Sequence, residues 1–403
     1  MQYLFTERAH LMCPNMNFAI AMSLKHPFDL ARIGKSLDVL AKAHPFLKAV
    51  LGYEERTNSY FYRIGETSKI ELIRKEEELN DLYSPAVIKA FQEVTQREWN
   101  LFEEGMLKII AWPMKEETGV LLVFHHLLAD GRGALGLAEE LALAYGNETV
   151  PEYAEEELIS SVRQFPENSS LPWVSGVLVK MANGSWRKEN HRVSYEQYLA
   201  FARDYLKRDR VRYSLKQIGE DELALLHQRC QNLGVTVNDA LVAEMMKTEQ
   251  TGKVIIASDL RDQLACYHAG ALGNYSTAFS VEVPFKQSRS DLARRIHREV
   301  EMIRNDPARL YLVLQCYAEL EPGLLDAAFL SAQGGFSSKA GEFIGTRFFN
   351  FASPRGHSVT NLGKAECSAI DQAYFIPPSS PAMKKTWGIL TMNGVMTICT
   401  SER

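Results

Sequence analysis

Two adjacent histidines, His125 and His126, end an apolar run of the chain, and Asp130 and Gly131 follow them closely. Neutral imidazole has an ordinary pKa of about 6.5, which suits proton abstraction at cellular pH. Successive side chains of a strand point to opposite faces. We therefore expect one histidine to face a cleft as a general base while the other packs inward. Asp130 is expected to order the base or its loop, and Gly131 to let the chain turn sharply beside the site.

Other interpretations of these residues stay open. The two histidines are also compatible with a packed, hydrogen-bonded strand end. As metal ligands they lack a third histidine, cysteine or carboxylate at a convincing spacing, so no metal site is predicted. Residues 131–136 fit the G-x-G-x-x-G dinucleotide pattern, with Glu152 about twenty residues further on. A dinucleotide loop follows its strand directly, whereas residues 125–130 intervene here. An NAD-dependent oxidoreductase is therefore the weaker alternative.

The residues around the histidines are predicted to form a strand pair and a helix. Residues 106–112 and 120–125 are interpreted as adjacent antiparallel strands joined by the polar turn 115–119. After Gly131, apolar residues recur at helical spacing up to Tyr145, and Gly146 is the expected C-cap. An earlier helix is expected to begin after the N-cap Asp29 and to end before Pro45.

The second half repeats the alternation of helices and strands. Helices are predicted at 220–232 and 238–246, and strands at 253–258, 275–283, 358–362 and 388–398, the last turning at Asn393-Gly394. Residues 147–212 carry three prolines and an acidic run, and we predict an irregular crossing between domains there. The expected organisation is two α/β domains, 1–165 and 166–403, with one large mixed domain as the alternative.

Composition and charge narrow the class of protein. A chain of 403 residues with 46% hydrophobic and 24% charged residues is typical of a globular protein of about two domains. Its net charge of −5 does not favour a nucleic-acid partner. The N-terminal residues lack the apolar run of a signal peptide, and the nearly apolar stretch 171–182 is shorter than the ~20 residues of a membrane span. Six scattered cysteines without a CxxC pair favour a reducing compartment. We expect a cytoplasmic protein without a membrane or nucleic-acid partner.

The stretch His125-His126-Leu127-Leu128-Ala129-Asp130-Gly131 resembles the HHxxxDG signature of the chloramphenicol acetyltransferase-like superfamily. This group includes nonribosomal peptide synthetase condensation domains, stand-alone alcohol acyltransferases and the plant BAHD enzymes. Weaker likenesses follow in the family's order at 28–48, 99–108, 235–241, 272–275 and 360–363, which resemble its HPxLR, FDLxxGPLLR, VTVNDVLL, GNF and SNLG segments. The DFGWG segment of BAHD enzymes is absent, so the resemblance does not point to a plant-type enzyme.

The resemblance implies an α/β (α+β) fold of two lobes, each a mixed sheet with helices, in a V shape around an active-site tunnel. The second histidine is the base in this family, so His126 is expected to deprotonate a hydroxyl or amine that attacks a thioester. The implied donor is acyl-CoA or a carrier-bound phosphopantetheine thioester, used as co-substrate, with no tightly bound cofactor and a small-molecule acceptor. Asp130 is expected to form a structural ion pair with Arg261 of the second lobe.

Further site residues follow from the same resemblance. Asn274, Ser358, Thr360 and Asn361 are expected to bind substrate. Thr360 and Asn361 are candidates for donating hydrogen bonds to the thioester oxygen, and a purely structural latch is the alternative role of their segment. The alternative function for the whole chain is a catalytically silent, condensation-like scaffold that binds a carrier protein.

Overall fold

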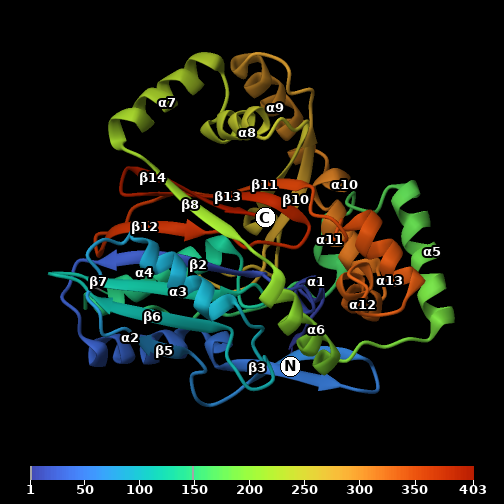
Figure 1. Ribbon diagram of the computed structural model, residues 1–403, viewed down its shortest axis with the longest axis horizontal. Helices are drawn as coiled ribbons and strands as arrows, with labels where there is room; N and C mark the ends of the chain where they lie inside the picture. Colours follow the sequence, from blue (N-terminus) through green and yellow to red (C-terminus); the bar gives the residue numbers. More distant parts are fainter. Residues whose placement is uncertain (1, 148) are drawn as a thin grey trace.

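One mixed sheet contains the predicted strand pair (Figure 1). In the computed structural model, which describes residues 2–147 and 149–403, this sheet has the strand order β12-β2-β7-β6-β5. Its strands are β2 (Asn17–Leu24), β5 (Glu71–Arg74), β6 (Leu107–Pro113), β7 (Thr118–His125) and β12 (Ile370–Ile376). As predicted, β6 and β7 are antiparallel neighbours, and all residues of β2 and β7 are buried. The paired histidines therefore stand at the end of a central, buried strand.

A strand from the C-terminal part of the chain completes this sheet. β12 lies antiparallel beside β2, with Tyr374 opposite Ala21 and Ile376 opposite Ala19. The segment 166–403 thus supplies an edge strand to the sheet of the segment 1–165 (Figure 1). No local pattern in the sequence predicts this exchange, which joins the two parts of the chain through backbone hydrogen bonds. The boundary at residue 165 stays a prediction.

A second mixed sheet is built from the C-terminal part of the chain, in the order β10-β9-β11-β13-β14-β8. Its strands are β8 (Arg212–Ile218), β9 (Lys253–Asp259), β10 (Ser276–Glu282), β11 (Gly356–Ala365), β13 (Met383–Met392) and β14 (Val395–Glu402). β11 runs parallel to both of its neighbours, and the other pairs are antiparallel. The strands predicted in this half are confirmed. The β13–β14 turn falls at Asn393-Gly394, where both residues have positive φ, as a tight hairpin requires.

A small sheet and the helices complete the fold. The small sheet has the order β1-β4-β3, from β1 (Gln2–Tyr3), β3 (Ala49–Glu54) and β4 (Ser59–Ile64). The N-terminal helices are α1 (Arg8–Leu11), α2 (Leu30–Ala43), α3 (Pro85–Thr95) and α4 (Gly131–Tyr145). The later ones are α5 (Trp173–Glu189), α6 (Tyr195–Arg208), α7 (Glu220–Leu233), α8 (Val237–Thr248), α9 (Arg289–Arg304), α10 (Pro307–Leu310), α11 (Leu312–Glu319), α12 (Pro322–Ala332) and α13 (Lys339–Phe343). Helices α7, α8 and α9 lie over the second sheet (Figure 1).

Side-chain caps explain where the helices nearest the histidines begin. The Asp29 carboxylate accepts a hydrogen bond from the backbone N–H of Arg32 at 3.0 Å, at the start of α2. The Asp130 carboxylate accepts one from the N–H of Gly133 at 2.9 Å, at the start of α4. Each cap satisfies a backbone donor that the first helical turn leaves free. The cap on α4 also fixes Asp130, four residues after His126.

The irregular crossing predicted for 147–212 is wrong in its second half, where α5 and α6 form. Pro172 stands immediately before the first residue of α5, a position where proline is compatible with a helix. Ser194 begins α6 with a capping box in which its hydroxyl bonds the backbone of Gln197 and the Gln197 amide bonds back. Pro172 therefore precedes α5 instead of interrupting it.

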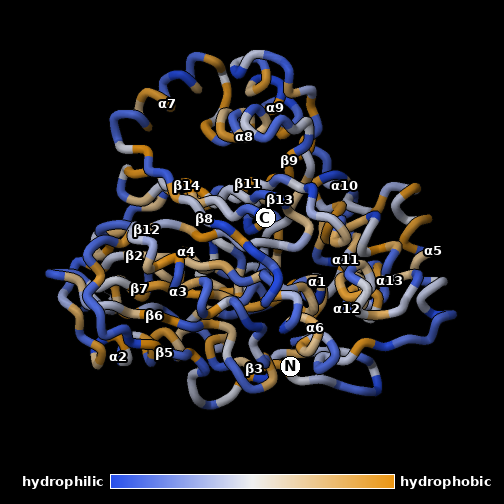
Figure 2. The backbone as a smooth tube through the Cα atoms, viewed as in Figure 1, coloured by the Kyte–Doolittle hydropathy of each residue, from blue (hydrophilic) through white to orange (hydrophobic). Residues whose placement is uncertain are grey.

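Two separate buried clusters reflect the lobes. One apolar cluster surrounds the first sheet and includes Trp99 and Phe124, and another surrounds the second sheet and includes Ile256 and Ile389. Figure 2 shows hydrophobic residues along β2, β6 and β7 and an alternation of hydrophobic and hydrophilic residues around α7 and α9. Within the described ranges, no helix has both the length and the apolar character needed to cross a bilayer.

Candidate active site

The two histidines of the motif have opposite environments, as the strand alternation predicted. His125 is 3% exposed, its Nδ1 accepts a hydrogen bond from the backbone N–H of Leu127 at 3.3 Å, and its ring packs near Trp99. Burial, helped by the neighbouring His126, lowers the pKa of His125 to about 3. His126 is partly exposed and follows the last residue of β7. His125 is thus a neutral packing residue, and His126 is the accessible one.

Asn274 fixes the orientation of the His126 ring. Its Oδ1 lies 2.9 Å from Nδ1 of His126, and its Nδ2 donates to the backbone carbonyl of His126 at 2.7 Å. Because Asn274 uses its nitrogen for that carbonyl, its oxygen faces the ring, and Nδ1 of neutral His126 must carry the proton. The lone pair is then on Nε2. The sequence assigned Asn274 to substrate binding, whereas the structure places its side chain on the base.

The pKa of His126 lies below its ordinary value. Burial is the main cause, and the hydrogen bonds at the ring and the negative charge of Asp130 oppose it only in part. The imidazole is therefore neutral near pH 7. A neutral ring with a free Nε2 is the form in which histidine accepts a proton.

Asp130 and Arg261 form the ion pair that the family resemblance implied. Asp130 Oδ1 lies 2.8 Å from Nη2 of Arg261, and Oδ2 lies 3.0 Å from Nη1. Oδ2 also accepts from the backbone N–H of Tyr275 at 2.9 Å. Asp130 is 2% exposed. Burial raises the pKa of Asp130, but Arg261 and these N–H groups outweigh it and hold that pKa below its ordinary value. The charged pair therefore joins the start of α4 to the segment between β9 and β10.

Gly131 acts through close packing. It is not among the residues with positive φ, so the chain does not use the left-handed region here, and the sharp turn expected at Gly131 stays a prediction. A Cβ atom at Gly131 would lie 2.5 Å from Cδ2 of Leu362, a residue of β11. The Arg132 guanidinium also donates to the backbone carbonyl of Leu362 at 2.6 Å. The first turn of α4 thus touches the second sheet, which leaves no room for a side chain.

The other predicted substrate residues lie on β11. The Ser358 hydroxyl is 2.8 Å from that of Thr386 on β13, and Thr360 pairs in register with Gly388. Asn361 contacts Asn238 at 3.3 Å, and its Oδ1 accepts from the N–H of Gly363 at 2.9 Å. These contacts hold β11 beside β13 and α8, and none of them joins the three side chains to His126. Their role toward substrate stays a prediction.

Sequence reasoning missed His10 and Phe18, which enclose the base. The His10 ring stacks on the His126 ring with centroids 4.5 Å apart and planes 25° apart. Phe18 of β2 meets the same ring edge to face at 5.2 Å. A single histidine in a four-residue helix, more than a hundred positions before the motif, carries no recognisable pattern. Only the folded chain brings it to the site.

Two further features bear on the alternatives. β7 is antiparallel to β2 and to β6. A dinucleotide-binding loop follows a parallel strand, so the glycine pattern at 131–136 does not form such a loop. Across residues 2–147 and 149–403, no group of three His, Cys, Asp or Glu side chains is arranged to hold a metal ion.

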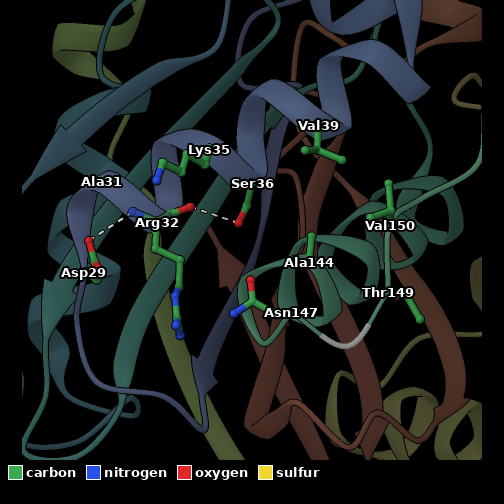
Figure 3. A pocket seen from close by; sticks show the side chains of 10 residues that line it. All are labelled: Asp29, Ala31, Arg32, Lys35, Ser36, Val39, Ala144, Asn147, Thr149 and Val150. Carbon is green, nitrogen blue, oxygen red and sulfur yellow. Dashed lines mark hydrogen bonds between the residues drawn. The ribbon is translucent and has the colours of Figure 1, made fainter.

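A surface depression of about 600 Å³ lies elsewhere on the first lobe (Figure 3). It is bounded by the start of α2, including Asp29, Arg32 and Ser36, and by Asn147 just after α4. α4 has 15 residues, so at about 1.5 Å per residue its two ends are roughly 20 Å apart. The depression is therefore remote from His126, which stands at the other end of that helix.

The fold defines the class of the protein, a two-lobed α/β chain of the chloramphenicol acetyltransferase-like type. A family model described as "Condensation domain" matches residues 1–248, and the chain belongs to this family.

Individual relatives are distant. The chain is 27% identical over 137 residues to a "Probable non-canonical nonribosomal peptide synthetase (NRPS) CymA" of Salinispora arenicola (strain CNS-205), a match covering 34% of this chain and 2% of that protein. The epimerization domain from the third module of tyrocidine synthetase B superposes with a TM-score of 0.56 at 14% identity, covering 99% of this chain and 88% of that one. The condensation domain of the Monacolin K polyketide synthase MokA gives 0.59 at 11% identity, covering 100% and 91%.

Proposed function

We propose that the protein transfers an acyl group from a thioester to a hydroxyl or amine acceptor, with Nε2 of His126 as general base. The observation that carries the proposal is the contact of Asn274 with Nδ1, which leaves the Nε2 lone pair free on a neutral, partly exposed ring. Membership of the condensation domain family supports an acyl or peptidyl transfer of this type. The donor is a phosphopantetheine thioester, carried by coenzyme A or by a carrier protein.

In the proposed reaction each proton has a donor and an acceptor. Nε2 of His126 accepts the proton of the acceptor O–H or N–H while that atom attacks the thioester carbonyl carbon. The tetrahedral intermediate then collapses, the C–S bond breaks, and the leaving thiolate takes the proton back from His126. Asn274 accepts from Nδ1–H throughout, which stabilises the imidazolium that forms between the two transfers. The Asp130–Arg261 pair holds the loop and takes no part in the proton transfer.

The test is a panel of acyl-CoA and acyl-pantetheine thioesters of graded chain length, each offered with alcohol and amine acceptors and followed by free-thiol release. The expected result is acceptor-dependent thiol release for at least one pair, together with acylated acceptor seen by mass spectrometry. His126→Ala should remove this activity, by roughly 10²–10⁴-fold in kcat. Thiol release no faster than in buffer for every pair would instead favour a silent, carrier-binding scaffold.

A further inference from the structure

A second imidazole lies against the ring of His126. His10 lies on α1 and stacks on His126 at 4.5 Å, nearly parallel to it, and both rings are partly exposed. Groups that reach the edge of one ring are therefore within reach of the edge of the other. The proposed proton transfer uses only the ring of His126, so it gives the ring of His10 no role.

In the part of the chain that the structure describes, the ring nitrogens of His10 make no hydrogen bond. The hydrogen bonds of the described residues include the backbone N–H of His10, bonded to the carbonyl of Glu7 at 2.8 Å, but neither ring nitrogen of His10. Burial lowers the pKa of His10 well below its ordinary value, and the neighbouring His126 and His125 lower it further. The ring is thus neutral, with one N–H donor and one lone pair that have no hydrogen-bond partner among residues 2–147 and 149–403.

The short helix that carries His10 is held rigidly. Arg8, two residues earlier, makes a buried two-point ion pair with Asp326 of α12, at 3.0 Å and 2.6 Å, and also donates to the backbone carbonyl of Asn58 at 2.6 Å. The ring of His10 also meets the ring of Tyr317 edge to face at 6.3 Å. A donor held in this way stays in place while charge develops beside it, as electrostatic stabilisation of a transition state requires.

We propose that His10 is a second catalytic residue, whose ring N–H donates a hydrogen bond to the thioester carbonyl oxygen as that oxygen becomes negative. The inference rests on the proposed acyl transfer and adds the residue that binds the oxyanion. The acceptor atom forms its bond to the carbonyl carbon, and the π electron pair of the carbonyl moves to the oxygen held by His10. The pair returns when the C–S bond breaks, so His10 neither gains nor loses a proton.

The role of His10 is separable from its packing. His10→Phe keeps an aromatic ring on His126 and removes the N–H, whereas His10→Gln keeps an N–H donor without the ring. Removal of one oxyanion donor costs roughly 10²–10³-fold in kcat. With the fastest donor and acceptor pair of the thioester panel, His10→Phe should lose about 100-fold in kcat with little change in KM or in Tm. His10→Gln should recover at least about tenfold of that loss.

The matched control is His227→Phe, the same substitution at an exposed residue of α7, which should leave kcat unchanged. If His10→Phe does not fold, His10→Leu replaces it as the variant without a donor. If the variant without a donor keeps a kcat within threefold of the parent, His10 is not the oxyanion donor. The same conclusion follows if His10→Gln, at normal Tm, loses as much kcat as His10→Phe. In both cases, loss of activity in His126→Ala would still support the proposed acyl transfer, so only the role of His10 would be refuted. Absence of thiol release in the parent protein refutes the function itself.

Discussion

Asn274 holds His126 at two points, with its amide oxygen 2.9 Å from Nδ1 of the ring and its amide nitrogen 2.7 Å from the backbone carbonyl of the same residue. One side chain thus fixes both the tautomer of the base and the strand end that carries it. Asn274 precedes β10 in the second lobe, and His126 follows β7 in the first. The base is therefore correctly oriented only when the lobes are joined.

Substitutions at Asn274 should change the pH dependence of the reaction. In Asn274→Asp a carboxylate faces Nδ1, which favours the imidazolium and should raise the pKa of His126 by about one unit or more. Because the base acts in its neutral form, the acid limb of kcat/KM should move to higher pH by the same amount. Asn274→Ala removes the contact and should lower kcat roughly tenfold or more. An unchanged acid limb in Asn274→Asp would show that the contact does not govern the base.

His125 and His126 should respond differently to replacement by alanine. His125 packs inward at 3% exposure, so His125→Ala should lower the free energy of unfolding by roughly 1–3 kcal/mol, measured by denaturant titration. His126→Ala should leave stability nearly unchanged and remove most of kcat. Equal losses of kcat with normal Tm in both variants would mean that the faces of the two rings are reversed.

The helices and strands that the sequence predicts correctly are marked by patterns of residues close together in the chain. Asp29, before apolar residues at helical spacing, marks the start of α2, and Gly146, after such residues, marks the end of α4. The Asn393-Gly394 pair marks a hairpin. Such signals act between residues close in sequence, so they can be recognised without a structure. The sequence does not predict α5, because prolines among polar residues are typical of a loop, although Pro172 lies just outside the helix.

Contacts between the lobes were predictable only where a resemblance supplied the pairing. Asp130 and Arg261 were paired in this way, and the structure brings their charged groups to 2.8 Å. His10 and the edge strand β12 were missed, because neither a stacked ring nor a strand register is encoded in the residues near it. For the same reason Asn274 was assigned to substrate, although its partner is the base itself.

Breaking the pair of Asp130 and Arg261 should cost much stability. Removal of one partner of a buried ion pair leaves the other charge uncompensated and costs roughly 3–5 kcal/mol. Asp130→Asn and Arg261→Ala should each lower the free energy of unfolding by about this amount. The double variant should lose much less than the sum, because both substitutions remove the same contact.

An exposed ion pair provides the control for this double-mutant cycle. Arg289 and Glu244 lie 2.6 Å apart, but both side chains are largely solvated, at 67% and 43% exposure. Solvent screening limits such pairs to about 1 kcal/mol or less. Strict additivity at Asp130 and Arg261, or a cost no larger than that of the exposed pair, would contradict a structural role for the buried one.

The free energy of unfolding should fall as the pH rises above neutral, because of His44. This residue is 1% exposed, 2.5 Å from Glu140 and 3.3 Å from Glu156. Burial lowers its pKa, but the hydrogen bonds and charges of the two carboxylates outweigh burial and raise the pKa of His44 to about 9. The folded state thus binds the proton more tightly than the unfolded chain, whose histidines have a pKa near 6.5.

The stabilisation from His44 is therefore complete below about pH 6.5 and is lost as pH rises through about 9. The loss should be on the order of 3 kcal/mol in the free energy of unfolding, measured by denaturant titration at steps between these two values. His44→Gln should flatten the slope over this range while lowering stability at neutral pH. The same slope in the parent and in His44→Gln would exclude His44 as its origin.

Two glycines of α4 should respond in opposite directions to alanine. At Gly136 a Cβ atom meets nothing within 4 Å, so Gly136→Ala should raise the free energy of unfolding by about 0.5–1 kcal/mol through helix propensity. At Gly131 the new atom would lie 2.5 Å from Cδ2 of Leu362, and overpacking of this kind costs about 1–3 kcal/mol. Because Gly131 follows Asp130, the displacement should also move the His126 loop and lower kcat.

Leu362→Ala removes the clashing atom, so the double variant should be more stable than the sum of the single losses predicts. Stabilisation by Gly131→Ala equal to that by Gly136→Ala would show that the contact between α4 and β11 is looser than the structure describes.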